Sequence, residues 1–253
     1  MQVAVGRVAV VTGASSGIGA ELARALAARG WRCVLLARRE DRLRELANEL
    51  DGEYEVCDVG DRASVDEVAA RVLERHPRIG LLVNNAGIAG RKRFTNAEPE
   101  RIEEVMRINY LGSVWPLRAF LPGLEAGAPS DVVNVVSVAG TIAWAPSGPY
   151  CASKHAQLAF SRATAAELRP RGIRVHTVLP GFVETEGFPQ HKTLKSRLAL
   201  RLVVEPDVVV RRILHALDHD RREVYTPRWY RVAGLVQGAA PGLLARALTG
   251  RRS

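Results

Sequence analysis

The sequence predicts an α/β fold of the Rossmann type: a doubly wound parallel sheet with helices on both faces, in three α/β/α layers. Two observations predict it. Short apolar runs rich in β-branched residues alternate with segments of helical spacing, as in parallel sheets that are buried on both faces. The first run leads directly into a glycine-rich turn and a helical segment, the order that begins a dinucleotide-binding unit. With 253 residues and 47% hydrophobic residues, we expect a sizeable core.

The expected strands leave room for a helix between each pair. They are expected at Val8–Val11, Arg32–Ala37, Leu81–Val83, Val132–Val136, Val175–Leu179 and Glu223–Thr226. Helical spacing predicts helices over Ala20–Ala28 and Asp207–Leu217, and a long helix that opens with Tyr150. No repeat, low-complexity tract or linker divides the chain, so residues 1–253 are expected to form a single domain.

The glycine-rich turn spans residues 12–19 and has the spacing G-x-x-x-G-x-G. At a helix start, unpaired N–H groups and the helix dipole attract phosphate. Gly13 permits the tight turn, Gly17 lets the backbone approach a pyrophosphate, and Gly19 lets helix and sheet pack closely. An ordinary strand-to-helix loop is the competing explanation. Ser15 and Ser16 count against it, because both add donors at the phosphate position.

The end of the second strand indicates which dinucleotide fits. An NAD site usually carries an acidic residue about 20 residues beyond the glycines, where it holds the ribose 2′-hydroxyl. Here Ala37 is followed by Arg38 and Arg39, and a guanidinium suits a 2′-phosphate. The sequence favours NADP(H), with Arg38 as the phosphate contact, and NAD(H) stays open as the alternative. Whether Arg39 also contacts the cofactor stays open, since both arginines can simply be solvated residues before the next helix.

From about Gly6 to Thr185 the chain resembles the short-chain dehydrogenase/reductase family. Several motifs agree with that family in content and order. They are the glycine turn, Asp58-Val59 after the third strand, Asn84-Asn85-Ala86-Gly87 after the fourth, Asn109 in Arg-Ile-Asn-Tyr-Leu-Gly, Ser137 after the fifth, Tyr150 and Lys154 in Tyr-Cys-Ala-Ser-Lys, and Pro180-Gly181-Phe182-Val183-Glu184-Thr185 after the sixth. One feature departs from many NADP-using members, because position 16 is Ser instead of Arg or Lys.

The resemblance implies an NADP(H)-dependent oxidoreductase that transfers a hydride between nicotinamide and a carbonyl or secondary-alcohol substrate. It implies catalytic roles for Asn109, Ser137, Tyr150 and Lys154, and a homodimer or homotetramer. Besides Arg38, Tyr150 and Lys154, the residues that it implies as cofactor contacts are Gly13, Ser15, Ser16, Gly17, Ile18, Gly19, Asp58, Val59, Asn85, Ala86, Gly87, Pro180, Gly181, Val183 and Thr185.

Tyr150 and Lys154 are the residue types that this proton chemistry needs. On a helix they lie one turn apart and face the same way. A free phenol ionises near pH 10 and is a weak acid at neutral pH, but a neighbouring ammonium stabilises its anion. Tyr150 can then give a proton to a carbonyl oxygen or take one from an alcohol. By the resemblance, Ser137 holds the same oxygen, and the Asn109 position holds a water beside the lysine.

Cysteine and histidine usage argues against other chemistry. Three cysteines without paired spacing predict a reducing compartment and no disulfide framework, and we expect all three to be inert. The six histidines show no ligand spacing, so no metal is expected.

The N-terminal residues lack the organisation of a signal peptide, and no segment reaches the ~20 apolar residues of a membrane span. We therefore expect a cytoplasmic protein.

The positive charge is concentrated at the C-terminus. Residues 187–253 hold 13 Lys and Arg against 5 Asp and Glu, nearly all of the net +9. The resemblance implies that this segment forms the substrate lid. No nucleic-acid-binding motif accompanies the charge, so a nucleic-acid partner is not expected. An anionic or acyl-chain substrate, peripheral membrane contact, and a solvated surface that covers the domain or a neighbouring subunit stay open.

Two other functions compete with turnover. The fold can serve a non-catalytic protein that senses a dinucleotide, although such a protein would tolerate loss of Tyr150 or Lys154, and both are present. The chain can also be a membrane-associated accessory protein that acts through its basic tail. The motifs leave the substrate open.

Overall fold

The structure is a computed structural model that describes residues 7–90, 93–145, 147–193 and 200–242. Its strands are β1 (Val8–Thr12), β2 (Arg32–Ala37), β3 (Glu53–Val56), β4 (Leu81–Asn84), β5 (Ser130–Val135), β6 (Ile173–Pro180) and β7 (Glu223–Thr226). Its α-helices are α1 (Gly17–Ala27), α2 (Glu40–Leu50), α3 (Arg62–Arg75), α4 (Pro99–Met106), α5 (Gly112–Ala126), α6 (Gly148–Leu168), α7 (Gln190–Thr193), α9 (Pro206–Asp218) and α10 (Tyr230–Ala239). Shorter turns are η1 (Phe94–Asn96), the π-helical η2 (Arg107–Leu111), η3 (Val138–Gly140) and η4 (Arg169–Arg171).

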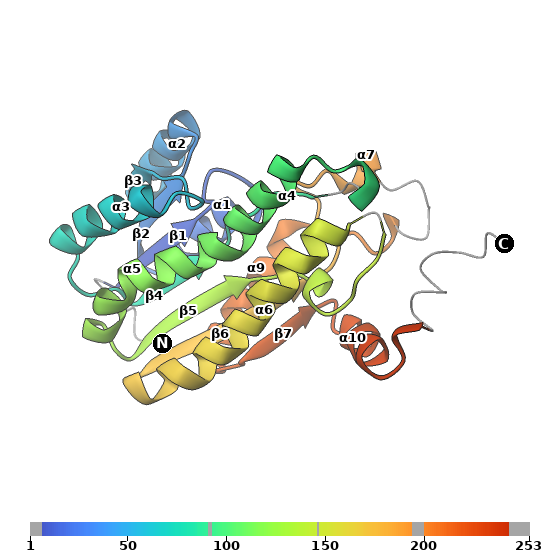
Figure 1. Cartoon of the computed structure of the whole chain (residues 1–253). Coiled ribbons are helices and arrows are strands. Elements are labelled where there is room, and N and C mark those ends of the chain that lie inside the picture. Colours follow the sequence, from blue (N-terminus) through green and yellow to red (C-terminus); the bar gives the residue numbers. More distant parts are fainter. Residues whose placement is uncertain (1–6, 91–92, 146, 194–199, 243–253) are drawn as a thin grey trace.

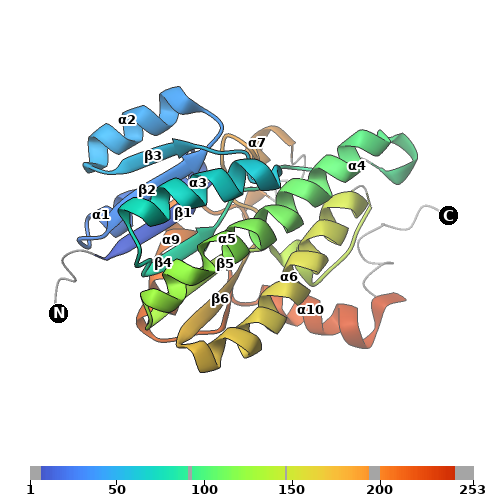
Figure 2. The same ribbon diagram turned by 60° about the vertical axis from the view of Figure 1, so that its left-hand side comes forward.

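The strands of the described residues form one parallel sheet in the order β3-β2-β1-β4-β5-β6-β7. Helices cover both faces (Figures 1 and 2). The predicted doubly wound three-layer fold is thus confirmed. The chain runs outward from β1 through β2 to β3, then returns to place β4 on the other side of β1. This reversal opens a crevice at the carboxyl ends of β1 and β4, where open α/β sheets bind their ligands.

Alternation along the strands divides the core into two halves. Val8 and Val10 of β1 pack with α3, α5 and the end of α6. Ala9 and Val11, which point the other way, pack with α1, α2 and α9. Successive side chains of a strand face opposite sides of a sheet, so an unbroken apolar run such as that of β1 supplies both cores at once.

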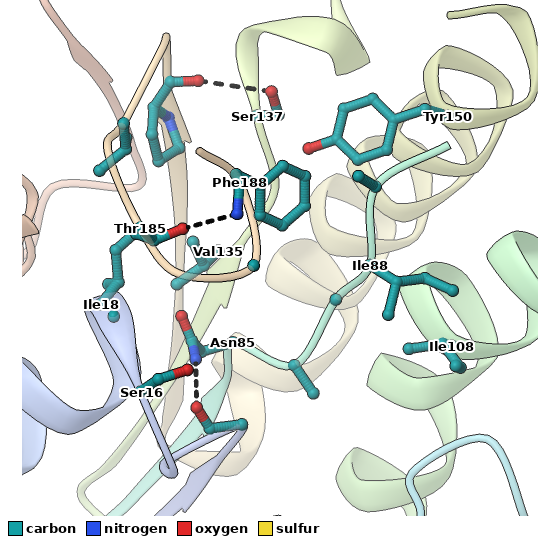
Figure 3. Close-up of a pocket in the computed structure, with 18 of the residues that line it drawn as sticks. Ser16, Ile18, Asn85, Ile88, Ile108, Val135, Ser137, Tyr150, Thr185 and Phe188 are labelled. Atoms are coloured by element: carbon teal, nitrogen blue, oxygen red, sulfur yellow. Dashed lines mark hydrogen bonds between the residues drawn. The ribbon is translucent and has the colours of Figure 1, made fainter. Parts of the chain in front are cut away.

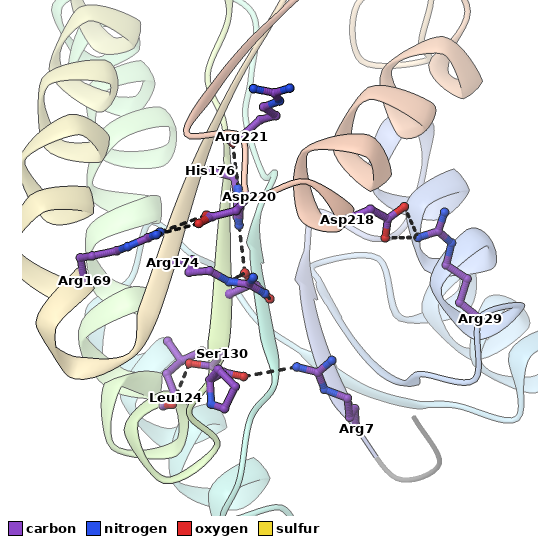
Figure 4. A network of polar contacts seen from close by, with 12 residues as sticks. Arg7, Arg29, Leu124, Ser130, Arg169, Arg174, His176, Asp218, Asp220 and Arg221 are labelled. Atoms are coloured by element: carbon purple, nitrogen blue, oxygen red, sulfur yellow. Dashed lines mark hydrogen bonds and ion pairs between the residues drawn. The ribbon is translucent and has the colours of Figure 1, made fainter. Parts of the chain in front are cut away.

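β5 and β6 begin earlier than their apolar runs predict, at Ser130 and Ile173. The extra residues include buried polar groups that an apolar criterion misses. Asp131 accepts from Arg174 in two hydrogen bonds of 2.8 Å and from His176 Nε2 at 2.9 Å. His176 is fully buried, and its Nδ1 lies 2.9 Å from the carbonyl oxygen of Arg221. This network ties the amino ends of β5 and β6 to the turn before β7 (Figure 4).

The segment after residue 187 has several structural roles. Within residues 206–226, α9 packs on α1, and β7 adds the last strand to the sheet. α10 packs against β7 and η3 at the end of the described chain. Among the described residues, no helix combines the length and the apolar character that a membrane crossing requires.

Candidate active site

A cleft of about 480 Å³ lies at the carboxyl ends of the strands (Figure 3). Its walls come from the glycine turn after β1, the ends of β2 to β6, the first turns of α6 and the segment 180–190. With two exceptions, Gly19 and Asn109, every predicted site residue lines this cleft. The predicted site therefore comes together as one continuous surface.

The glycine turn has a backbone that few other residues tolerate. Gly13 and Gly17 have φ angles of +64° and +58°, in the left-handed region that favours glycine. Gly19 lies beneath the turn, where an added Cβ would stand 2.4 Å from the carbonyl oxygen of Gly13. Its role is therefore in packing helix against turn. α1 carries no acidic residue in its first turn, so the positive end of its dipole faces the cleft unopposed.

Asn85 fastens the end of β4 to the glycine turn. Its Nδ2 donates to the carbonyl oxygens of Thr12 and Gly13 at 3.0 and 3.3 Å. In return, the Thr12 hydroxyl accepts from the backbone N–H groups of Asn85 and Ala86 at 3.0 and 3.2 Å. The side-chain amide nitrogen of Asn85 is thus occupied by hydrogen bonds within the protein, and the residue shapes the cleft by holding β4 and the glycine turn together.

Arg39, which the sequence left open, contacts the glycine turn directly. Its Nη2 donates to the hydroxyls of Ser16 and Ser15 at 2.7 and 3.1 Å. Its Nη1 forms an ion pair with Glu186, in the segment after β6, at 2.7 Å. Arg38 lines the same part of the cleft. A guanidinium therefore lies beside position 16, the position at which the sequence lacks a basic residue.

Ser137 and Tyr150 bring two hydroxyl groups to the other end of the cleft. Ser137 follows β5 and Tyr150 lies in the first turn of α6; Figure 3 shows the Tyr150 hydroxyl pointing toward the side of the cleft where Ser137 lies. Ser137 Oγ accepts from the N–H of Ala139 at 3.1 Å and donates to the carbonyl oxygen of Pro180 at 3.4 Å. The ring of Phe188 packs 5.9 Å from that of Tyr150, between centroids. The segment after β6 therefore covers the tyrosine.

Lys154 lies one helical turn beyond Tyr150 and is buried. Its Nζ donates to Gln157 Oε1 at 2.8 Å and to the carbonyl oxygen of Val135 at 3.3 Å, and it stands 5.9 Å from the centroid of the Tyr150 ring. Burial lowers the pKa of Lys154 to about 7. The amine therefore holds its proton loosely near neutral pH, and an anion beside it would favour the charged form.

Gln157 is a residue of the site that sequence reasoning missed. It is fully buried, and its Nε2 donates to the hydroxyl of Ser113 at 2.7 Å while its Oε1 accepts from Lys154. The amide of Gln157 thereby links the Lys154 amine to Ser113 and fixes its position. Its spacing of three residues from Lys154 on the same helix is the signal that points to it.

Asn109 lies behind the cleft wall, within the π-helical turn η2. Its Nδ2 donates to the carbonyl oxygen of Ile88 at 3.0 Å and to Ser153 Oγ at 3.1 Å. Its Oδ1 accepts from the N–H of Ile88 at 2.8 Å. The side chain clamps the loop after β4, and π-helical turns of this kind recur at functional sites.

The cleft lining combines apolar and polar side chains. The apolar ones include Ile88, Ala89, Val138, Trp144, Phe182 and Phe188, and the uncharged polar ones include Ser147 and Gln190. Trp144 lies in a loop that sequence motifs do not mark. Cys57 also lines the cleft, and burial raises the pKa of its thiol to about 11. Cys33 has a pKa raised to about 11 by burial, and that of buried Cys151 is also raised, so all three thiols stay protonated at neutral pH.

Comparison with known proteins decides the family. The model of the family described as short chain dehydrogenase matches residues 7–194. The chain belongs to the short-chain dehydrogenase/reductase family. It is 41% identical over 187 residues to a putative ketoacyl reductase of the monensin polyketide synthase from Streptomyces virginiae, covering 71% of each chain.

Two solved structures of this family carry nicotinamide cofactors. A short chain dehydrogenase from Burkholderia cenocepacia in complex with NADP is 29% identical, with a TM-score of 0.84 over 99% of this chain and 100% of that one. A family member from Burkholderia phymatum in complex with NAD is 25% identical, with a TM-score of 0.84 over the whole of both chains. The chain is therefore a member of an oxidoreductase family whose structures bind nicotinamide dinucleotides.

Proposed function

We propose that the protein is a cytoplasmic, NADP(H)-dependent oxidoreductase that interconverts a carbonyl compound and the corresponding secondary alcohol. The observation that carries this proposal is the convergence of Ser137, Tyr150 and buried Lys154 at one end of a cleft whose other end is a glycine turn. When bound, the dinucleotide supplies or accepts the hydride. The chain supplies position, charge and the proton.

The glycine end of the cleft fits a dinucleotide phosphate. The unopposed N-terminus of α1 favours an anion, and the close contacts around Gly13 and Gly19 hold the backbone in place for it. Arg38 and Arg39 lie where a 2′-phosphate would end, and Asp58 and Val59 line the neighbouring wall after β3. Two guanidinium groups and no carboxylate at the end of β2 support NADP(H) over NAD(H).

At the substrate end, Tyr150 would donate its proton to the carbonyl oxygen during reduction and take it back during oxidation. Ser137 would turn its hydroxyl from Pro180 toward the same oxygen and so orient the carbonyl group. Lys154 would carry full positive charge as the phenolate forms beside it, because an adjacent anion favours the protonated amine. Asn109 and Gln157 would act as positioning residues, through Ile88 and Lys154 respectively.

The lining of the substrate end favours an apolar carbonyl compound over a sugar. Trp144, Phe182 and Phe188 offer apolar contact area for such a compound, whereas Ser147 and Gln190 are uncharged polar groups in the same lining. The segment that begins at Gly187 packs Phe188 on Tyr150, and we assign it the role of substrate lid.

A panel of carbonyl compounds, followed by NADPH absorbance, tests the proposal. The panel should contain apolar ketones, keto-acyl thioesters and aldoses, each assayed with NADPH and with NADH. We expect NADPH consumption with at least one apolar ketone or thioester and weaker activity with NADH. Tight NADPH binding without turnover on any compound would instead favour a dinucleotide-sensing protein.

A further inference from the structure

Large apolar side chains are exposed at one end of the molecule. Six of them are substantially exposed in the described part of the chain, and five lie in η1, at the N-cap of α10 or within α10. They are Phe94, Trp229, Val232, Leu235 and Val236. Phe94 is 77% exposed and Leu235 is 64% exposed. We call the surface formed by these five residues the η1–α10 face.

α10 is held so that its apolar stripe points outward. Val232, Leu235 and Val236 are spaced by three and four residues, so they share one side of the helix. The opposite side is packed. The ring of buried Tyr230 lies against Gly181, and Gly234 lies against Thr141. The exposed stripe is therefore a fixed feature of the fold.

The η1–α10 face borders the mouth of the cleft on two sides. α10 rests on η3, and the loop that follows η3 carries Trp144 into the cleft lining. On the other side, Gly90 lines the cleft just before the segment that leads to η1 and Phe94. Figures 1 and 2 both show α10 and the segment before α4 at the same end of the molecule.

Basic residues accompany the apolar ones. Arg93, Arg228 and Arg231 are all exposed beside them. From Val224 to Ser253 the sequence has five arginines and no acidic residue. In the segment after β6, Glu184 pairs with His191 and Glu186 pairs with Arg39. The acidic residues nearest to Phe94 in the sequence are Glu98 and Glu100, at the start of α4.

The charge decides between two occupants of the face. A second copy that packed α10 against α10 about a twofold axis would bring arginines against arginines, because the sequence has no acidic residue from Val224 onward. A membrane with anionic lipids offers phosphate and carboxylate groups to the arginines and an acyl boundary to the apolar stripe. We propose that the η1–α10 face docks peripherally on an anionic lipid surface, with the mouth of the cleft toward the bilayer.

Vesicle flotation of the full chain tests this proposal. Wild type should float with vesicles of phosphatidylcholine and phosphatidylserine, bind phosphatidylcholine alone weakly, and come off in high salt, which screens surface charge. Replacing Arg228 and Arg231 together by Gln should lower the partition coefficient by roughly 20- to 30-fold, because each arginine near such a surface contributes about fivefold. The double variant Val232→Ser and Leu235→Ser should lower it at least tenfold.

Matched controls keep the test specific to this face. Val56, on β3, is the sixth of the exposed large apolar residues in the described part of the chain, and Val56→Ser should leave flotation unchanged. Arg42→Gln with Arg78→Gln removes the same charge as the double arginine variant, from exposed positions away from this face. Thermal midpoints and NADPH titrations of all variants show whether the fold is intact. These readouts do not depend on turnover, so they stand apart from the proposed function.

Two outcomes would overturn the proposal. In the first, wild type does not float with anionic vesicles, and light scattering shows an oligomer that the Val232→Ser, Leu235→Ser variant dissociates. A second copy then covers the face. In the second, the face variants and the matched controls float equally well, so that lipid binding lies elsewhere on the surface.

Discussion

Lys154 illustrates at residue scale how burial and function are linked. A buried ammonium without a carboxylate partner costs free energy, and the protein tolerates it here with two uncharged acceptors, Gln157 and Val135. The result is an amine whose pKa falls to about 7. Such a group responds to charge beside it, which is what a proton relay at neutral pH requires.

Lys154 should leave a signature in the pH dependence of stability. In the unfolded chain its pKa is about 10.4, and in the folded chain about 7. Between these values the unfolded chain binds more protons, so the free energy of unfolding should rise with pH across this window and be flat below it. In Lys154→Met this contribution should vanish. The thermal midpoints of both proteins should be measured without cofactor from about pH 6.5 to pH 10. The midpoint of wild type should rise relative to that of Lys154→Met as pH increases. Parallel curves would show that folding does not lower the pKa of Lys154.

The arginines after β2 determine the expected cofactor preference. Charge-assisted hydrogen bonds to a 2′-phosphate contribute about 1.5–3 kcal/mol each, so wild type should bind NADPH roughly 10- to 100-fold more tightly than NADH. Changing Ala37 to Asp and Arg38 to Leu together should remove or reverse this preference, because the aspartate repels the phosphate and accepts from ribose hydroxyls. Fluorescence titration with both cofactors measures it.

Three further variants isolate the contribution of Arg39. Arg39→Leu should weaken NADPH binding and spare NADH, whereas Arg42→Leu, one turn further along α2 and exposed, should change neither. Glu186→Gln should strengthen NADPH binding by roughly 1.5- to 5-fold, the range of an exposed ion pair, because it releases Arg39. If the Ala37 and Arg38 double variant keeps its preference for NADPH, Arg38 is an ordinary solvated residue.

At the scale of elements, β5 and β6 show how the sheet is anchored at the edge opposite the cleft. The carboxylate of Asp131 is almost completely buried between Arg174 and His176. Both ring nitrogens of His176 face oxygen acceptors. The network thus depends on one negative charge in a position that water barely reaches.

Asp131→Asn should therefore destabilise the fold by about 2–3 kcal/mol, since it leaves Arg174 and His176 without their anion; the lower end reflects the partial exposure of Arg174. The variant's turnover per folded molecule should match wild type, because the cleft lies at the other edge of the sheet. Arg29→Gln breaks the exposed pair with Asp218 and should cost no more than about 1 kcal/mol. Urea titration measures both variants, and equal losses would contradict the assignment of a buried anchor.

The elements also show how far sequence reasoning reaches. β1, β2 and β4 could be predicted because they are apolar runs before turns with a fixed chemical task. The site motifs lie at strand ends, so a parallel sheet necessarily gathers them at one edge. Side-chain contacts between distant segments carry no such periodic signal. The contact of Arg39 with Ser16, the support of Lys154 by Gln157 and the clamp of Asn109 on Ile88 all depend on tertiary packing.

At the scale of the whole molecule, α6 presents a second surface of interest. Ala152, Ala159 and Ala163 are exposed on it, and Ala156 is partly exposed. Their spacing puts them on one side of the helix, and small side chains permit close helix approach. This surface is distinct from the η1–α10 face, which lies at the mouth of the cleft.

We expect a homodimer or homotetramer built on this α6 surface. Ala159→Glu should dissociate it, because the substitution places bulk and like charge at a close helix contact, while an exposed position leaves the monomer fold intact. Light scattering at micromolar concentration measures the mass of both proteins. A monomeric wild type would count against the interface, as would an Ala159→Glu variant of unchanged mass.

Turnover in the Tyr150→Phe variant tests most directly the claim that Tyr150 moves the proton in this cleft. The substitution removes one hydroxyl and keeps the ring that packs on Phe188, so thermal midpoint and NADPH affinity should stay near those of wild type. With the best carbonyl substrate of the panel, NADPH consumption should fall at least ~100-fold, the scale of losing a general acid. A variant that binds NADPH normally and still turns over at a rate near wild type would contradict the mechanism.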